Sequence, residues 1–302
     1  MSAPSEVGRP WILPNLGAEE GLDWRAYPAE PHARTAARLL SLLFAPTARR
    51  AHALPDGTWT SVAVADDWPD ALGSLPQRAV EPWLDTTPEA FAWLNTRSLA
   101  ESLAHGLLGQ PRVVLAGPAP DTVRALHDKR FAVDSARALG LHSKTLDPLI
   151  LVLEPEELLR TDETLARLAD ALERWPGWTA RRFTLKPRFG TSGRGRTGGE
   201  GHVDGLRGAL SRLARRGGAV FEPWLERTVD LSVVLHALSV GSQPTLLASF
   251  EMLTTRSGGF RGHCGELDAR GGITSGDAED AGLRAGALAV ARRACAQGFV
   301  GA

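Results

Sequence analysis

The chain has 302 residues, 43% of them hydrophobic and 23% charged, and its 34 Lys and Arg against 35 Asp and Glu give a formal net charge of -1. This composition is typical of a soluble globular protein of two or three domains and argues against a generally basic nucleic-acid or membrane binder. No apolar run approaches the ~20 residues of a membrane span, and the start lacks the charged and apolar regions of a signal peptide. Two cysteines, Cys264 and Cys295, are too few for a disulfide framework, so we expect a reduced cytoplasmic setting.

Hydrophobic patterns predict few elements in the first 125 residues, which are rich in Pro and Trp. Residues 11–13 predict a strand, and residues 33–44 predict a helix with a broad apolar face. A second helical pattern covers residues 88–108. Residues 112–116 then predict a strand with a Gly-Pro exit loop.

From residue 121 onward, helical and extended patterns alternate clearly. A long helix is expected over residues 121–139, ended by Gly140, and a hairpin is expected around Gly241-Ser242. Residues 256–276 are glycine-rich and predict a loop. The remaining expected elements are strands at 149–153, 182–186, 219–222, 230–238 and 244–253, and helices at 161–174, 202–216 and 277–297. This mixture of helices and antiparallel hairpins predicts an α+β fold in several subdomains.

The stretch over residues 181–201 carries the strongest chemical signal. Its strand ends at Pro187, which cannot donate to a sheet ladder. Glycines let backbone amides turn toward one point, and hydroxyls add donors, so such a loop can wrap phosphate oxygens. The loop contains Gly190, Gly193, Gly195, Gly198, Gly199 and Gly201, the hydroxyl residues Thr191, Ser192 and Thr197, and the cations Lys186, Arg188, Arg194 and Arg196.

Glycine-rich loops also have simpler explanations. Many are only flexible connections, and an Arg-Gly run can be a disordered nucleic-acid contact. The pattern G-x-x-x-x-G-K-[ST] is absent, because Lys186 precedes the glycines. The sequence matches G-x-G-x-x-G at Gly193, Gly195 and Gly198, but a dinucleotide site needs a strand directly before that motif and a helix opening within it.

Three further stretches fall in order around the glycine loop: His127-Asp128-Lys129-Arg130-Phe131, Val220-Phe221-Glu222-Pro223-Trp224-Leu225, and Val229-Asp230-Leu231-Ser232-Val233. In this order, the chain resembles the ATP-grasp superfamily of carboxylate–amine and carboxylate–thiol ligases, which includes D-alanine–D-alanine ligase and biotin carboxylase. The resemblance is firm over roughly residues 120 to 254 and loose over residues 1–119. It implies an ATP-grasp fold with a preceding α/β domain at 1–125, a central lid subdomain at 126–222 and a C-terminal subdomain at 223–302.

The resemblance also implies which residues hold a nucleotide. Lys129 resembles the first nucleotide lysine, which contacts the phosphates. Lys186 resembles the second, which reaches the α-phosphate and the adenine edge. The loop residues that would close over the β- and γ-phosphates are Ser192, Gly193, Arg194 and Gly195.

The base and ribose would be held by the segment after the glycine loop. Glu222 resembles the hinge acid that accepts from the adenine amino group, and Trp224 and Leu225 offer backbone groups to the ring. Asp230 stands where the family usually has an acid on the ribose hydroxyls. The competing explanations are a solvated helix face for Lys129, a satisfied strand-end acid for Glu222 and a salt-bridge partner for Asp230.

In such ligases the substrate carboxylate attacks the γ-phosphate, and an amine or thiol then displaces phosphate from the acyl carbon. Arg256 and Arg261, with His263 close by, are candidates for binding the transferred phosphate or the substrate carboxylate. Each residue taken singly fits an ordinary surface loop as well. The resemblance implies ATP and Mg2+ as cofactors, and a small-molecule or peptide carboxylate with an amine or thiol acceptor as substrates.

The chain departs from the family after its last long helix. The family places magnesium ligands there, an acid on one strand and an E-x-N motif on the next, whereas no E-x-N occurs here after residue 255. Residues 298–301 look like the beginning of such a strand. We expect either the ATP-binding part of a longer or split ligase, or a catalytically inactive ATP-binding scaffold, with a partner chain or a second copy completing the third subdomain.

Overall fold

The computed structural model describes residues 11–13, 89–92, 94–105, 113–190, 193–226, 229–255, 260–264, 266–267, 273–274 and 281–301. The chain forms two compact units, Met1–Val123 and Arg124–Ala302. Helices and mostly antiparallel sheets occur together among the described residues, which confirms the α+β fold class. The helix expected at 33–44 lies outside the described residues, and the three-part division inferred from sequence stays a prediction.

The first unit contains a parallel sheet in the order β1-β2-β3, formed by Trp11–Leu13, Glu89–Ala92 and Val114–Leu115. The helix expected over 88–108 is wrong in its first part, because residues there pair as β2. Helix α3 spans Arg97–Ala104, and the Thr96 side chain caps it by accepting from the Leu99 backbone N–H at 3.3 Å. A β-strand pair and a helix cap therefore override the continuous helical pattern.

The single helix expected over 121–139 is two helices, α4 (Pro120–His127) and α5 (Lys129–Ala138). Asp128 separates them with an extended backbone, and its carboxylate accepts from the Arg130 backbone N–H at 2.9 Å. Asp is a preferred N-cap residue, which explains why a new helix begins there. The break makes Lys129 the first residue of α5.

The second unit begins with a four-stranded antiparallel sheet in the order β4-β7-β5-β6. The prediction that residues 197–200 form loop is wrong, because they pair with β5 as a hairpin strand. The strands are β4 (Leu151–Leu153), β5 (Arg182–Pro187), β6 (Thr197–Glu200) and β7 (Ala219–Pro223). The helices around them are α6 (Pro155–Leu159), α7 (Thr161–Glu173) and α8 (Arg207–Arg215), with 3-10 turns at Asp147–Leu149, Gly177–Thr179 and Asp204–Leu206.

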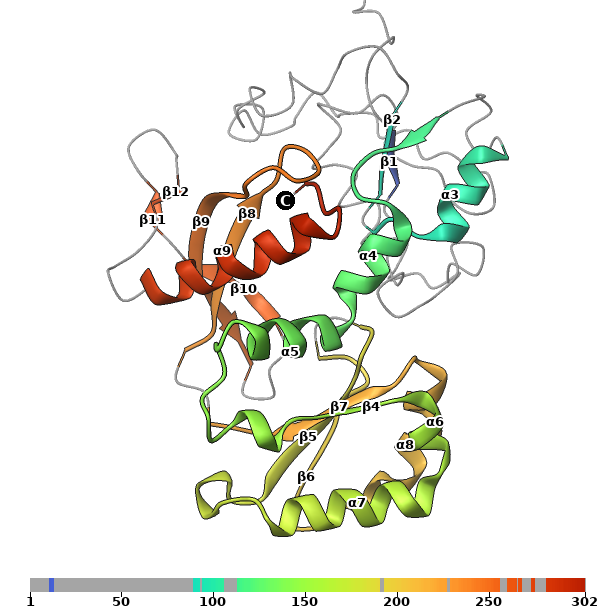
Figure 1. Cartoon of the computed structure of the whole chain (residues 1–302), viewed down its shortest axis with the longest axis vertical. Coiled ribbons are helices and arrows are strands. Elements are labelled where there is room, and N and C mark those ends of the chain that lie inside the picture. Colours follow the sequence, from blue (N-terminus) through green and yellow to red (C-terminus); the bar gives the residue numbers. More distant parts are fainter. Residues whose placement is uncertain are drawn as a thin grey trace, which may run out of the picture. The chain divides into compact units, whose positions relative to one another are not determined.

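Alternation along β5 and β7 divides this sheet into an apolar and a polar face. Phe183, Leu185 and Phe221 are buried in the main core with side chains of α7 and α8, and the Phe183 and Phe221 ring centroids are 5.2 Å apart. Alternate positions, among them Thr184 and Lys186, therefore lie on the other face. There Val220 packs against Val133 of α5 and Ile150, and Figure 1 shows α5 on this side of the sheet.

A second antiparallel sheet in the unit has the order β10-β9-β8, and helix α9 (Ala281–Ala296) lies across it (Figure 1). Its strands are β8 (Leu231–His236), β9 (Thr245–Thr254) and β10 (Phe260–Cys264), and a short pair joins β11 (Glu266–Leu267) to β12 (Ile273–Thr274). The loop expected over 256–276 is therefore wrong for these last three strands. Gly301 exchanges backbone hydrogen bonds of 2.8 and 2.9 Å with Ala237, next to β8.

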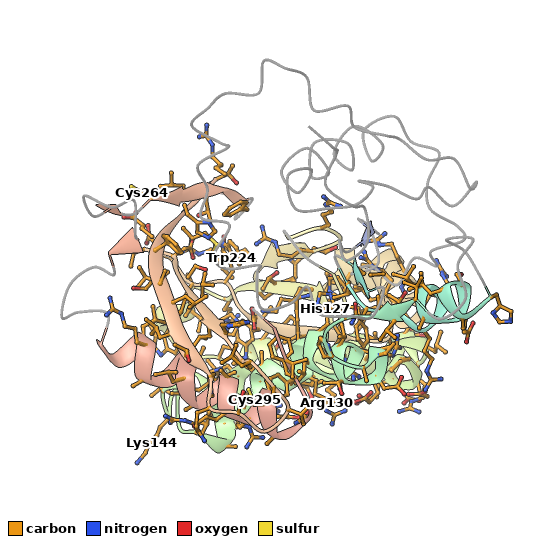
Figure 2. The ribbon with its side chains drawn as sticks, turned by 90° about the horizontal axis from the view of Figure 1, so that it is seen from above. His127, Arg130, Lys144, Trp224, Cys264 and Cys295 are labelled. Atoms are coloured by element: carbon orange, nitrogen blue, oxygen red, sulfur yellow. The ribbon has the colours of Figure 1, made fainter. Side chains whose placement is uncertain are left out.

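Both cysteines are free thiols, an exposed one at Cys264 and a buried one at Cys295 (Figure 2). This agrees with the expectation that the chain has no disulfide framework. Of the helices that the described residues form, none has the length and apolar character needed to cross a bilayer. The cytoplasmic setting stays a prediction.

A glycine in β6 makes the hairpin with β5 possible, which gives a first test of the fold. A Cβ at residue 199 would lie 2.6 Å from the Phe183 ring, which is fixed in the core. We expect Gly199→Ala to weaken the hairpin by about 1–3 kcal/mol through overpacking, measured by amide hydrogen exchange of β5 and β6. Gly208→Ala is the control: residue 208 meets nothing within 4 Å on an exposed helix face and should stabilise α8 by about 0.5–1 kcal/mol. Equal protection in both variants would contradict the packing assigned to Phe183.

Candidate functional site

Lys129 lies at the start of α5, directly beside the glycine-rich segment. Its backbone N–H donates to the Arg188 carbonyl at 3.0 Å, and its Nζ donates to the Gly190 carbonyl at 2.7 Å. Burial, together with the neighbouring charges of Lys186 and Arg216, lowers the pKa of Lys129 to about 8. Lys129 is thus no solvated surface lysine, and the second predicted lysine lies close enough to act on it electrostatically.

Arg188 holds the end of β5 against the start of α5 through a buried ion pair. Its Nε donates to the Asp128 carboxylate at 2.9 Å, and its Nη1 donates to Glu154 Oε2 at 2.6 Å. The two carboxylates raise the already high pKa of Arg188. The sequence placed Arg188 among the cations of the loop, but two acids already neutralise it, and its role is to hold β5 against α5.

Lys186 and Glu222 come from adjacent strands and lie on the same polar face. In the β5–β7 register, Lys186 is opposite Val220 and Glu222 is opposite Thr184, so the two charged residues are diagonal neighbours. Lys186 Nζ donates to Glu222 Oε1 at 2.5 Å, and both side chains are only partly exposed. The two residues that sequence reasoning assigned to phosphate and base are therefore paired with each other.

The glycine-rich segment has two structurally different parts. Residues 193–195 form a turn, and both Gly193 and Gly195 have positive φ angles, of 71° and 75°, which L side chains rarely adopt. Arg194 is exposed in this turn. Gly198 and Gly199 instead belong to β6 and pair with β5. We call residues 193–195 the glycine turn; Ser192 lies outside the described residues.

Trp224 follows β7 and borders two cavities. Its backbone N–H donates to the Arg182 carbonyl at 2.8 Å. This amide is therefore used within the sheet and is not the group that would donate to an adenine ring. Arg196 lies over the Trp224 ring, 3.9 Å from its centroid, which is cation–π geometry. A cavity of about 440 Å3 beside them is lined by Arg182, Thr184 and Arg196. Two buried atoms of its lining residues, Thr184 Oγ1 and Arg182 Nε, have no hydrogen-bond partner among the residues that the structure describes.

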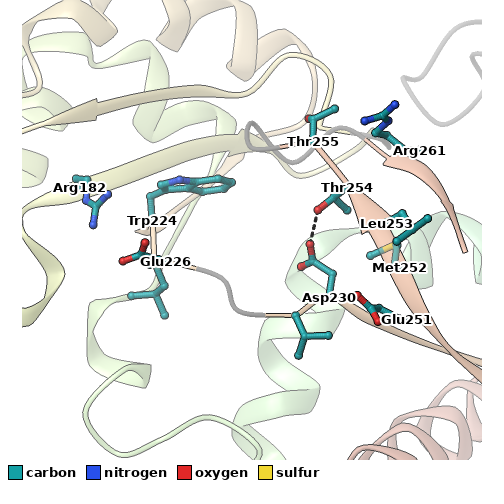
Figure 3. A pocket seen from close by; sticks show the side chains of 12 residues that line it. Arg182, Trp224, Glu226, Asp230, Glu251, Met252, Leu253, Thr254, Thr255 and Arg261 are labelled. Carbon is teal, nitrogen blue, oxygen red and sulfur yellow. Dashed lines mark hydrogen bonds between the residues drawn. The ribbon is translucent and has the colours of Figure 1, made fainter. Parts of the chain in front are cut away.

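The larger cavity, of about 810 Å3, is shown in Figure 3. Arg182 and Trp224 line one side, and Asp230 lies across the cavity from them. Asp230 Oδ2 accepts from the Thr254 hydroxyl at 2.6 Å, which orients the carboxylate at the cavity. The full lining is Arg182, Trp224, Leu225, Glu226, Val229, Asp230, Glu251, Met252, Leu253, Thr254, Thr255 and Arg261.

Arg261, on β10, is the one predicted catalytic residue that the described residues place, and it lines this cavity. Arg256 lies outside the described residues. His263 packs against Phe250 and Phe260, with ring centroids 5.3 and 5.0 Å away. No three His, Cys, Asp or Glu side chains come together as a metal site within the part of the chain that the structure describes.

Sequence reasoning missed Arg216, Thr184 and the stacking of Arg196 on Trp224. Arg216 follows α8 in a run of two arginines, a pattern that predicts a solvated helix end and gives no signal of a site. Thr184 could have been predicted from the alternation of β5, because Thr184 shares the polar face with Lys186. The Arg196 contact depends on β6, which was expected to be loop.

Comparison with known proteins gave matches only among solved structures. No family model matches the chain, and no curated protein matches it. The chain is similar to D-alanyl-alanine synthetase A from Vibrio cholerae, at 10% identity and a TM-score of 0.46 over 70% of this chain and 60% of that one. D-alanine–D-alanine ligase from Bacillus anthracis matches at 11% identity and 0.46 over 97% and 79%, and biotin carboxylase from Campylobacter jejuni at 14% and 0.44 over 68% and 43%.

D-alanine–D-alanine ligase and biotin carboxylase are also the two enzymes named above with the sequence resemblance. The chain spans 60% of the length of the synthetase and 43% of the carboxylase. Because the identities are below 25% and the TM-scores below 0.5, activity has to be argued from this chain's own side chains.

The buried ion pair of Arg188 predicts a large loss of stability on truncation. Arg188→Ala leaves the Asp128 and Glu154 carboxylates without their main counter-charge, and we expect a loss of about 3–5 kcal/mol in the opening free energy of β5. Hydrogen exchange of β5 amides measures it. Arg130→Ala is the control, since Arg130 contacts Glu154 from a half-exposed position and should cost no more than about 1 kcal/mol. A loss of similar size in the two variants would show that Arg188 is not the fastening residue.

The lowered pKa of Lys129 predicts a rise in stability at alkaline pH. Between about 8, its folded value, and 10.5, its ordinary value, the unfolded chain binds a proton that the folded chain does not. The free energy of unfolding should therefore increase as pH rises through this window. We expect the pH dependence of thermal unfolding between pH 8 and 10 to flatten in Lys129→Met. Lys144→Met, at an exposed lysine that points outward in Figure 2, should leave it unchanged.

Proposed function

We propose that this chain binds ATP on the polar face of the β5–β7 sheet and acts as an ATP-dependent carboxylate ligase, or supplies the ATP-binding part of one. The observation that carries the proposal is the convergence of Lys129, Lys186 and Glu222 on one face beside the glycine turn. Two basic side chains from different elements, next to backbone with positive φ angles, fit a polyphosphate better than a single anion.

The phosphate end of the ATP would lie at Lys129, Lys186 and the glycine turn, which we call the phosphate clamp. Lys129 comes from a helix start and Lys186 from a strand, so their charges reach different oxygens of one triphosphate. In the structure Lys186 is paired with Glu222, and Lys129 donates to the Gly190 carbonyl. Binding therefore exchanges these internal contacts for charge-assisted bonds to phosphate.

The base and ribose would lie in the cavity beyond Trp224. Trp224, Leu225, Met252 and Leu253 supply apolar surface there, and Asp230 supplies an acceptor for ribose hydroxyls. The rest of the lining is mostly polar and charged, with Arg182, Glu226 and Glu251 among its residues. Asp230 is held in place by Thr254, which supports its assigned role.

In the proposed reaction, a carboxylate oxygen of the substrate bonds to the γ-phosphorus as the β–γ bridging P–O bond breaks, giving an acylphosphate and ADP. An amine or thiol then bonds to the acyl carbon, loses a proton, and releases phosphate. The chain's contribution is orientation and charge neutralisation by Lys129 and Lys186.

The Lys186–Glu222 ion pair also favours a second candidate function. A lysine and an acid that satisfy each other can hold the lid sheet together without any ligand. The chain would then be a catalytically inactive ATP-binding scaffold that works with a partner chain. Turnover separates the two functions. The ligase releases ADP when carboxylates and amines are supplied, whereas the scaffold binds ATP and releases no ADP.

Isothermal titration with ATP, with and without magnesium, tests the placement of the clamp. We expect Lys186→Ala to weaken ATP binding by about 10- to 100-fold, as the loss of a charge-assisted contact implies. That change also removes the lysine that pairs with Glu222. The double variant Lys186→Ala/Glu222→Gln therefore separates the lost attraction between Lys186 and phosphate from the added repulsion between Glu222 and phosphate. Lys144→Ala is the matched control on an exposed lysine. Unchanged affinity in both Lys186 variants would show that the clamp is misplaced.

A further inference from the structure

Arg216 lies between α8 and β7, where the chain reverses direction. It is the C-cap residue of α8, and the two glycines after it complete the helix end: Gly217 N–H donates to the Ala214 carbonyl and Gly218 N–H to the Leu213 carbonyl, each at 3.0 Å. Both glycines have positive φ angles, of 83° and 108°. The position of Arg216 is therefore fixed by the backbone of the fold and is not that of a loose surface arginine.

The Arg216 guanidinium packs against the backbone of the glycine-rich segment. A Cβ added at Gly195 would lie 2.2 Å from Arg216 Nη1, and one added at Gly190 would lie 3.2 Å from Nη2. Any other residue at position 195 would occupy the space that the guanidinium fills. Glycine at 195 thus permits both the φ angle of 75° and the close approach of the guanidinium, which a side chain there would push away.

Arg216 also belongs to the same electrostatic environment as the two lysines. Its charge helps to lower the pKa of Lys129, as does the charge of Lys186. Glu222 acts in the opposite direction on Lys129 and is itself paired with Lys186. Arg188 does not add to this group of cations, since Asp128 and Glu154 neutralise it.

These cations are held close together despite their mutual repulsion. Lys129, Lys186 and Arg216 come from a helix start, a strand and a helix end, so three separate elements bring them to the glycine-rich segment. Lys186 is in addition paired with Glu222. Several cations from separate elements are stabilised together by a ligand that carries several negative charges, such as the terminal phosphates of a nucleotide.

We propose that Arg216 is a third cation of the phosphate clamp and binds the β- and γ-phosphates beneath the glycine turn, next to Lys129. This inference rests on the proposed ATP-binding function and adds a residue to it. Arginine suits the position, because its planar fork donates to two phosphate oxygens at once. The site therefore selects di- and triphosphates over monophosphates.

Titration of ATP, ADP, AMP and inorganic tripolyphosphate into wild type, Arg216→Gln and Arg215→Gln tests the inference. For Arg216→Gln we expect about a tenfold or greater loss in affinity for ATP, ADP and tripolyphosphate, and less than about a twofold loss for AMP. Arg215→Gln, on the exposed end of α8, should bind all four as wild type does. Arg216→Lys should recover part of the loss, since it restores the charge without the fork.

An equal loss for AMP and ATP would overturn the inference, because it would mean that Arg216 only supports the fold. So would unchanged affinity for ATP in Arg216→Gln. Failure of the proposed function looks different: wild type would bind tripolyphosphate in an Arg216-dependent way without binding ATP any tighter. No binding of either ligand by wild type would overturn both.

Gly195→Ala provides an independent readout, because its added Cβ would collide with Arg216 Nη1. In the Arg216→Gln background the collision is removed while the backbone strain at position 195 remains. We expect Gly195→Ala to weaken tripolyphosphate binding by at least about threefold more in the wild-type background than in Arg216→Gln. Equal effects in the two backgrounds would show that the guanidinium and the glycine turn are not coupled, against the inference.

Discussion

The ion pair between Arg188 and the two carboxylates of Asp128 and Glu154 is the constraint on which the site depends. It joins the end of β5 to the cap of α5 and to the residue after β4. Because Asp128 both caps α5 and receives Arg188, the helix begins at a fixed distance from the strand. That geometry brings Lys129 onto the carbonyls at the start of the glycine-rich segment. Without it, Lys129 would be an ordinary lysine at a helix start.

The second constraint is the alternation of β5 and β7. One face of the sheet buries Phe183, Leu185 and Phe221 in the core, so every second residue is turned to the other face. Lys186 and Glu222 share that face because the residue before each of them in its strand, Leu185 or Phe221, points into the core. The chemistry of the site is thus a consequence of packing: moving the register by one residue would bury both charges among α7 and α8.

Local patterns were sufficient to predict β5, β7, α7 and the β8–β9 hairpin, because each has a strong period or turn signal. They failed at Asp128, where a cap residue divides a continuous helical pattern, and at 197–200, where strand pairing overrides glycine's low strand propensity. Lys129, Lys186 and Glu222 were found through their order along the chain. Arg216 could not be found, since its role depends on a contact with Gly195 that only the folded backbone creates.

Three cations gather beside one carboxylate in the proposed site. Lys186 is paired with Glu222, Lys129 donates to a backbone carbonyl, and Arg216 packs against glycines. A backbone carbonyl offers only a partial charge, and it cannot compensate an ammonium as a phosphate would. Burial, and after it the charges of Lys186 and Arg216, lower the pKa of Lys129, because the charged lysine is poorly solvated and repelled there. A bound polyanion would offset that repulsion, and this is the reason to regard the corner between α5, β5 and the glycine turn as a site for phosphates.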